Sequence, residues 1–131
     1  MRLEQETAQM LRFAADVARE MGHSYVGSIH LLMALSRDPG STGRLLRIMN
    51  AEPDLIQRLS AVLYGVGTPL LPLPQGFSTD AKIILKDAAV EARALQNKRI
   101  GCMHVLLSLA RHRETPAGEL LQFCGVDTDT L

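Results

Sequence analysis

Apolar residues recur at intervals of three and four positions in two long segments of the chain. The stripes consist of Met10, Ala14, Val17, Ala18 and Met21 in the first segment, and of Ile84, Ala88, Ala92 and Leu95 in the second. This spacing places the apolar side chains on one face of an α-helix and leaves the other face polar. Each segment is therefore predicted to be an amphipathic helix that packs one face against a core.

A second kind of helix is predicted after each of these. The segment 28–37 is apolar at nearly every position between Ile29 and Leu35. A helix that is apolar on most sides must be largely surrounded by protein, so we expect it at the centre of its half of the molecule. Ser28 stands where its hydroxyl oxygen would cap the helix, and Gly22 is expected to end the helix before it.

Shorter leucine-rich helices are predicted to follow. The loop DPGST offers Ser41 or Thr42 as a helix cap, and Thr115 followed by Pro116 gives the same signal later in the chain. Pro53 is expected to open a further helix. The segment 64–77 contains three prolines and three glycines, which predicts a linker, and its apolar side chains suggest that it lies against the domain. Ser78 or Thr79 then caps the next helix.

The chain repeats itself with an offset of 74 positions. YVGSIHLLMALSR at 25–37 corresponds to RIGCMHVLLSLAR at 99–111, and eight of 23 residues are identical between segments 15–37 and 89–111. We interpret this as a tandem duplication. The predicted fold is all-α, with two pseudo-symmetric four-helix repeats at 5–63 and 78–131 joined by a linker at 64–77. The final VDTDTL stands where the fourth helix of the second repeat would begin, so we expect that helix to be truncated.

Length, charge and cysteine content narrow the possible functions. A chain of 131 residues fits one compact domain, and its 14 basic and 14 acidic residues provide no basic face for nucleic acid or an anionic membrane. The apolar runs are too short to cross a bilayer and the first residues lack a signal-peptide core, so we expect a cytoplasmic protein. Cys102 and Cys124 are expected to be buried, reduced thiols.

The sequence predicts neither a metal site nor an active site. The four histidines, at 23, 30, 104 and 112, do not share the spacing that puts two ligands on one helix face, so packing or capping is their expected role. Cys102 and His104 are two residues apart and point to different sides of a helix. No GxxxxGK[ST] phosphate-binding loop occurs. Arg37 and Arg111 are expected to interact favourably with helix carboxyl ends, and Gly27 and Gly101 to permit a close backbone approach.

The duplicated motif G-H-x-x-[IV]-G-x-x-H-[LIV]-L-x-x-L resembles the Clp amino-terminal repeat domain of ClpA-, ClpB- and ClpC-like chaperone ATPases. GHSYVGSIHLLMAL at 22–35 is the closer copy, and NKRIGCMHVLLSL at 97–109 is the looser one. The resemblance implies a non-catalytic domain that receives unfolded or tagged protein substrates, or adaptor proteins, at the front of a hexameric AAA+ unfoldase. ATP and Mg²⁺ would bind only in separate motor domains. The alternative is a freestanding Clp-repeat protein that regulates or docks without a motor.

One departure from the family pattern concerns substrate choice. In ClpC-type members a glutamate usually precedes the motif histidine in both copies and helps to hold phosphorylated arginine. This chain has Ile29 and Met103 at those positions. Losing a carboxylate removes a charge-assisted hydrogen bond worth about 1.5–3 kcal/mol, so we expect no phosphoarginine recognition.

The predicted protein-binding surface is the groove between the two repeats, where two apolar faces meet incompletely. It includes the starts of the two central helices and part of the linker. The candidate residues are Ser28, Ile29, Leu71, Leu73, Phe77, Cys102 and Met103. We expect the isolated domain to be a monomer and any hexamer to form through motor domains.

Overall fold

The computed structural model describes residues 2–67 and 76–126, and within them the chain is mainly helical, as predicted. Leu71, Leu73, most of the predicted linker and all but the first residue of VDTDTL lie outside the described residues. The described helices are α1 (Gln5–Glu20), α2 (Ser28–Ser36), α3 (Ser41–Ile48), α4 (Pro53–Tyr64), α5 (Thr79–Ala94), α6 (Cys102–Arg111) and α7 (Pro116–Phe123). Two short strands, β1 (Arg2–Leu3) and β2 (Arg99–Ile100), accompany them.

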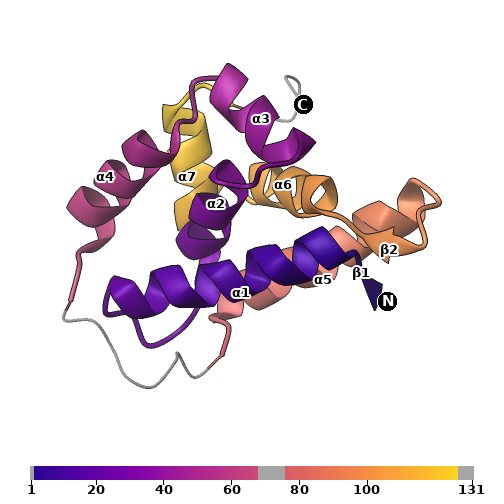
Figure 1. Cartoon of the computed structure of the whole chain (residues 1–131), viewed down its shortest axis with the longest axis horizontal. Coiled ribbons are helices and arrows are strands. Elements are labelled where there is room, and N and C mark those ends of the chain that lie inside the picture. Colours follow the sequence, from indigo (N-terminus) through magenta and orange to yellow (C-terminus); the bar gives the residue numbers. More distant parts are fainter. Residues whose placement is uncertain (1, 68–75, 127–131) are drawn as a thin grey trace.

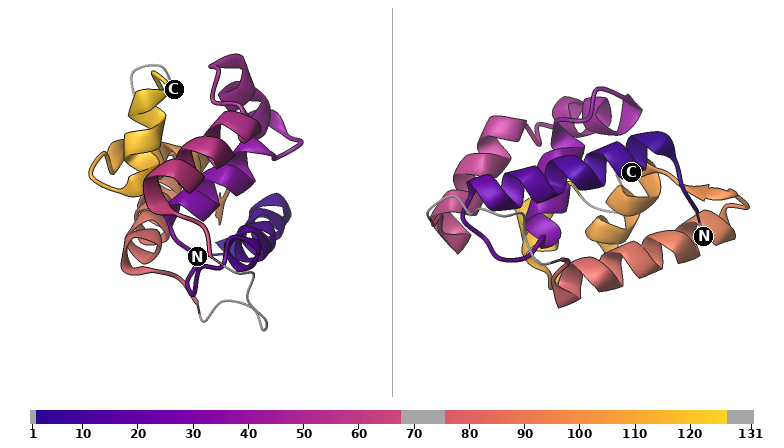
Figure 2. Two further views of the ribbon diagram at one scale, coloured as in Figure 1. Left: turned by 90° about the vertical axis from the view of Figure 1, so that its left-hand side faces the viewer. Right: turned by 60° about the horizontal axis from the view of Figure 1, so that its bottom comes forward.

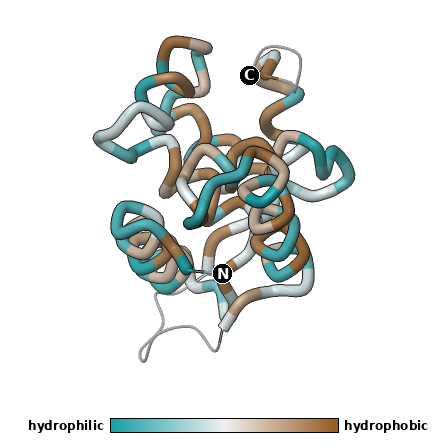
Figure 3. The backbone as a smooth tube through the Cα atoms, turned by 90° about the vertical axis from the view of Figure 1, so that its right-hand side faces the viewer, coloured by the Kyte–Doolittle hydropathy of each residue, from teal (hydrophilic) through white to brown (hydrophobic). Residues whose placement is uncertain are grey.

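The two central helices are α2 and α6, as the apolar pattern predicted. Every residue of α2 is buried, because its side chains are apolar on all sides. The helices α1 and α5 lie on one side of this pair, and α3 and α7 lie on the other (Figures 1 and 2). Figure 3 shows the most hydrophobic stretches of backbone gathered in the middle of the molecule. The core is therefore built from both repeats together.

The repeats exchange short extended segments, which the sequence did not predict. In the parallel strands, Leu3 pairs with Ile100, and an isolated parallel bridge joins Phe77 to Val26. The partners in the second pair are the equivalents of those in the first, with the repeats interchanged. The chain entering the first helix of each repeat thus pairs with the chain entering the central helix of the other repeat, and this arrangement ties the halves together.

The motif histidines cap the central helices, and the predicted Ser28 cap is wrong. The N-cap of α2 is Gly27, whose N–H donates to His30 Nδ1 over 2.8 Å, and the Gly101 N–H donates to His104 Nδ1 over the same distance. A third-position side chain that reaches back to the N-cap amide satisfies one of the orphan donors of a helix start. The Ser28 hydroxyl instead accepts a hydrogen bond from the Ala117 N–H, at 3.1 Å.

Of the other predicted helix caps, those of α5 and α7 are confirmed and that of α3 is wrong. Ser78 and Thr115 cap α5 and α7 as predicted, each accepting a bond from a backbone N–H three residues later. Pro53 and Pro116 occupy the first turns of α4 and α7, also as predicted. The cap of α3 is Gly40, so the prediction of Ser41 or Thr42 is wrong. Adjacent small polar residues give the same local signal, and backbone geometry decides between them.

The closest backbone approaches occur at Gly43 and Gly118, not at Gly27. A β-carbon built on Gly43 would lie 2.0 Å from the Asp38 carbonyl oxygen, and one on Gly118 would lie 2.1 Å from the His112 carbonyl oxygen. On Gly27 the nearest atom would be 3.5 Å away, which is ordinary contact. The two third helices therefore require glycine to approach the ends of the central helices.

Candidate protein-binding site

The predicted site residues differ in how deeply their side chains are buried. Ser28, Ile29 and Cys102 lie in the core, with 1%, 6% and 7% of their surfaces exposed. Phe77 and Met103 are half-buried and pack against the core from its edge. The expectation that these residues form one exposed surface is therefore wrong for the three buried ones. A protein-binding role for the set stays a prediction, and it now depends chiefly on Met103.

The two central helices have different neighbours in the two repeats. In repeat one, α4 contacts both α2 and α7, and the Tyr64 hydroxyl donates to the Glu119 carboxylate at 3.2 Å. Within 2–67 and 76–126 no helix takes the equivalent position against α6 and α3. Met103 is half-buried, whereas only 6% of its counterpart Ile29 is exposed.

A pocket of about 350 Å³ lies at the seam between the repeats, and we call it the seam pocket. Repeat one contributes Glu4, Glu6 and Asp38 with the start of α3, and repeat two contributes the start of α6, including Cys102 and Met103. A second depression next to it is lined by Ser41, Arg44, Leu45, Ile48 and Met103. Met103 is shared by both. Its thioether side chain thus joins a polar pocket to an apolar surface.

Carboxylates already face the two helix starts at the seam pocket. A β-carbon built on Gly101, the N-cap of α6, would lie 3.0 Å from a Glu4 carboxylate oxygen. A β-carbon built on Gly40, the N-cap of α3, would lie 3.0 Å from an Asp38 carboxylate oxygen. A helix N-terminus carries partial positive charge that favours an anion, and here the protein's own carboxylates occupy that position. A phosphate group would meet negative charge there.

The Cys102 thiol is not a nucleophile in this setting. Burial is the main cause that raises its pKa from 9.0 to about 11, and the carboxylates of Asp38, Glu4 and Glu6 also raise it, against a weak bond to the Thr7 hydroxyl. A thiol reacts as its thiolate, so a raised pKa makes it inert at neutral pH. Both cysteines are free, but Cys124 is only half-buried, which corrects the prediction that both are buried.

The histidines of the motif form a hydrogen-bonded chain. His30 Nδ1 accepts from the backbone, so Nε2 carries the proton and donates to His23 Nδ1 at 2.7 Å; His23 Nε2 then donates to the Gly65 carbonyl at 3.1 Å. In repeat two Asn97 replaces the first histidine, and its Oδ1 lies 2.8 Å from His104 Nε2. Desolvation, followed by the charge of His23, lowers the pKa of His30 to about 4. His30 is therefore a neutral cap, and His104 makes the equivalent bond to the Gly101 N–H.

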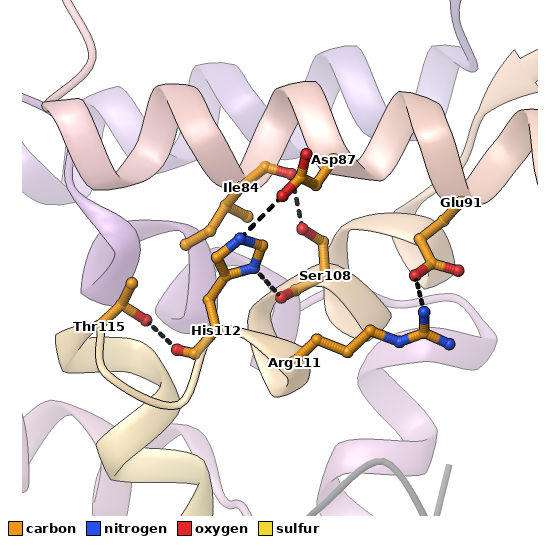
Figure 4. A network of polar contacts seen from close by, with 7 residues as sticks. All are labelled: Ile84, Asp87, Glu91, Ser108, Arg111, His112 and Thr115. Atoms are coloured by element: carbon orange, nitrogen blue, oxygen red, sulfur yellow. Dashed lines mark hydrogen bonds and ion pairs between the residues drawn. The ribbon is translucent and has the colours of Figure 1, made fainter.

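His112 belongs to a separate polar network between α5 and α6 (Figure 4). Its Nε2 lies 2.8 Å from an Asp87 carboxylate oxygen, and its Nδ1 lies 2.7 Å from the Ser108 carbonyl oxygen. The Ser108 hydroxyl donates to the Ile84 carbonyl, and Arg111 pairs with Glu91. These bonds fasten the end of α6 to α5.

No group of three or more histidine, cysteine or acidic side chains in the described part of the chain is arranged to hold a metal ion. No described helix is both long and apolar enough to span a membrane. The arrangement at the seam can bind by shape, apolar contact and charge. Sequence reasoning missed the carboxylates of Glu4, Glu6 and Asp38, because their convergence depends on the exchange of segments between repeats.

Comparisons with known proteins agree with this architecture. A family model described as the Clp repeat (R) N-terminal domain matches residues 2–64 and 76–131. The ATP-dependent Clp protease ATP-binding subunit ClpA homolog of Porphyra purpurea is 27% identical over 131 residues, covering 99% of this chain and 16% of the relative. The chloroplastic chaperone protein ClpC1 of Oryza sativa subsp. japonica is 28% identical over 133 residues, covering 99% of this chain and 14% of the relative.

Solved structures show the same fold. The Hsp104 N-terminal domain of Candida albicans has a TM-score of 0.76 at 18% identity, covering 99% of this chain and 86% of that chain. The N-terminal domain of the ClpD chaperone of Arabidopsis thaliana has a TM-score of 0.70 at 17% identity, covering 98% and 88%. The chain thus spans only a small part of the two curated relatives and most of these two solved domains.

Proposed function

Because the chain belongs to the Clp repeat (R) N-terminal domain family, we propose that it receives protein substrates or adaptor proteins for a Clp-type ATP-dependent unfoldase. The domain has no catalytic role in this proposal. Support comes from relatives that are named as ATP-binding subunits of Clp protease or as Clp chaperones, of which the chain spans 14–16%. ATP hydrolysis and assembly into a hexamer would be functions of motor domains.

The observation that carries the proposal is the exposed apolar surface at the seam. Met103 joins the seam pocket to a surface formed by Leu45 and Ile48, and 73% of Ile48 is exposed. Apolar side chains grouped at the boundary of two repeats form a surface that unfolded segments can cover. Binding would occur by fit and apolar contact. The ligands would be unfolded or tagged chains or an adaptor, met by a monomeric domain in the cytoplasm.

Phosphoarginine is not among the proposed ligands. Ile29 and Met103 provide no carboxylate for a guanidinium group, and Ile29 is buried as well. Glu4 and Asp38 face the helix starts where a phosphate would otherwise be stabilised. The phosphate group of a phosphoarginine side chain would therefore meet carboxylates at the seam instead of free helix N-termini.

The test is an NMR titration of the isotope-labelled chain with an unfolded, apolar-rich polypeptide and, separately, with a phosphoarginine peptide. We expect shifts around Met103, Leu45 and Ile48 with the first ligand alone. Met103→Glu should weaken binding about tenfold, or ~1.4 kcal/mol, because it places a charge in an apolar contact.

The matched control for this variant is Phe123→Glu. Phe123 is the repeat-two equivalent of Ile48 and is 75% exposed, but it lies on α7 and not at the seam pocket. Unchanged polypeptide affinity in a folded Met103→Glu protein would rule out this site. Shifts at the seam with the phosphoarginine peptide would contradict the exclusion of that ligand.

A further inference from the structure

Equivalent positions of the two repeats form a closed cleft in one repeat and an open one in the other. In repeat two, the cleft between α5 and the end of α6 is closed by the contact of His112 Nε2 with an Asp87 carboxylate oxygen, at 2.8 Å, and by the bond from the Ser108 hydroxyl to the Ile84 carbonyl (Figure 4). Three of these side chains supply polar atoms that cross from one helix to the other. The cleft is therefore filled by the protein's own groups.

Repeat one does not reproduce the contacts that Asp87, Ser108 and His112 make in repeat two. Its residues at the positions of Asp87, Ser108 and His112, 74 positions earlier, are Phe13, Ala34 and Asp38. Phenylalanine and alanine form no polar bond across the cleft. An open groove of about 440 Å³ lies there, and we call it the repeat-one groove; its apolar lining is Met10, Phe13, Ala34 and Pro39.

The groove has an apolar floor and an acidic edge. Met10 and Ala34 are almost fully buried beneath it, whereas 38% of Phe13 is exposed. Glu6 and Asp38 line its edge and also line the seam pocket, so the two hollows are adjacent. Within the described residues, neither carboxylate takes part in an ion pair. The one cation in the lining, Arg37, donates to Gln57 Oε1 at 2.6 Å.

We propose that the repeat-one groove binds an extended peptide segment in which a bulky apolar side chain lies next to a lysine or arginine. The apolar side chain packs on Met10, Phe13 and Ala34, and the neighbouring cation faces Glu6 and Asp38. This inference rests on the proposed function and specifies the class of substrate segment that the domain prefers.

Size and charge select this occupant. A hollow of about 440 Å³ lies within the usual range for ligand pockets and has room for one large side chain and its neighbours. Glu6 and Asp38 would repel an acidic segment and attract a basic one, and Glu4 extends the same charge into the seam pocket. An unfolded chain offers many apolar residues, and the acidic edge selects among them.

The proposal is tested by fluorescence anisotropy with labelled twelve-residue peptides on a Gly-Ser background. One peptide carries a phenylalanine flanked by two lysines, a second replaces the lysines with glutamates, and a third replaces the phenylalanine with alanine. We expect the first peptide to bind at least tenfold more tightly than the other two. Equal affinity for the lysine- and glutamate-flanked peptides would overturn the proposal.

Two variants with matched controls locate the binding. Phe13→Ser should lose at least tenfold affinity for the lysine-flanked peptide, whereas Val90→Ser, at an exposed apolar residue of α5, should lose none.

The double variant Glu6→Gln and Asp38→Asn tests the acidic edge. It should lose three- to tenfold affinity for the same peptide, and the remaining binding should depend less on salt. Its control, Asp54→Asn with Glu114→Gln, neutralises two exposed carboxylates elsewhere. Thermal melts show that each variant is folded. Equal losses in variants and controls would overturn the assignment.

The apolar-rich polypeptide separates this inference from the proposed function. If that polypeptide binds at Met103 while the lysine-flanked peptide does not bind, the groove proposal fails and the general receptor function stands. If neither ligand binds, both fail. Binding of the lysine-flanked peptide, with losses in Phe13→Ser and in the Glu6→Gln and Asp38→Asn double variant, supports the groove even if Met103→Glu leaves that binding unchanged.

Discussion

At the scale of single residues, the structure gives specific meaning to positions that look ordinary in the sequence. Glycine is common in loops, but only a few glycines here exclude every larger side chain. Histidine suggests chemistry, but the two motif histidines each accept a hydrogen bond from a backbone N–H at a helix start. Both cases yield measurable expectations about stability.

The first expectation concerns Gly43 and Gly118. Replacing either with alanine should lower the free energy of unfolding by about 1–3 kcal/mol, because a backbone carbonyl occupies the space that the methyl group needs. Gly27→Ala is the control and should cost less, about 0.5–1 kcal/mol, since the added methyl group would make only ordinary contacts, at 3.5 Å or more, and only the helix cap changes. Urea denaturation measures all three. A cost at Gly43 no larger than at Gly27 would contradict the geometry.

The second expectation concerns pH. The pKa of His30 falls from 6.5 in the unfolded chain to about 4 in the fold. The unfolded state therefore binds the proton more readily, and the stability held above pH 6.5 is lost as the pH drops toward 4, by about 3 kcal/mol. His30→Gln keeps an acceptor for the Gly27 N–H and should flatten this part of the curve. The measurement is the loss of unfolding free energy between pH 7.5 and pH 4.5 in the wild type and in His30→Gln. Equal losses in the two proteins would refute the assignment of this loss to His30.

At the scale of elements, the start of α7 depends on a group from the other repeat. The Ser28 hydroxyl, at the start of α2, accepts the Ala117 N–H at the start of α7. Both groups are buried, so the bond cannot be replaced by one to water. The contact fixes how the two repeats meet.

Ser28→Ala should therefore cost about 1–3 kcal/mol of unfolding free energy, since it leaves a buried N–H without an acceptor. Ser60→Ala is the matched control, because the Ser60 hydroxyl is buried with no hydrogen-bond partner among the described residues. That change should be neutral or slightly stabilising. Similar costs for the two variants in chemical denaturation would show that the bond to Ala117 contributes nothing.

The elements also show how far sequence reasoning extends. Periodicity predicted the helices, and Ser78, Thr115, Pro53 and Pro116 marked helix starts correctly, because those signals are local. The cap of α2 is Gly27 and not Ser28 because of the backbone angles at these positions. Both residue types can adopt those angles, so the sequence does not decide between them. Burial of Ile29 was foreseeable from its apolar neighbours, but the different burial of its counterpart Met103 was not. An apolar pattern shows that a residue packs and does not show against what.

At the scale of the whole molecule, duplication has produced two halves that share a framework and differ at its edges. Both repeats keep the capping histidine and the close-packed glycine of the third helix. They differ in two places. In repeat one α4 packs on α2, and Phe13 stands at the position that Asp87 takes in repeat two. The framework sets the fold, while the differences leave hollows in some places and close them in others. The seam pocket and the repeat-one groove both arise from such differences.

The exchanged segments have an evolutionary consequence. Each repeat donates an extended arm before its first helix and offers a docking edge before its central helix, and the arm of one fits the edge of the other. A polypeptide with a single repeat would carry both parts, and two copies would satisfy each other about a twofold axis. The present chain has the geometry of such a homodimer within one molecule. Gene fusion would then have replaced a concentration-dependent association with an intramolecular one, and each half became free to diverge.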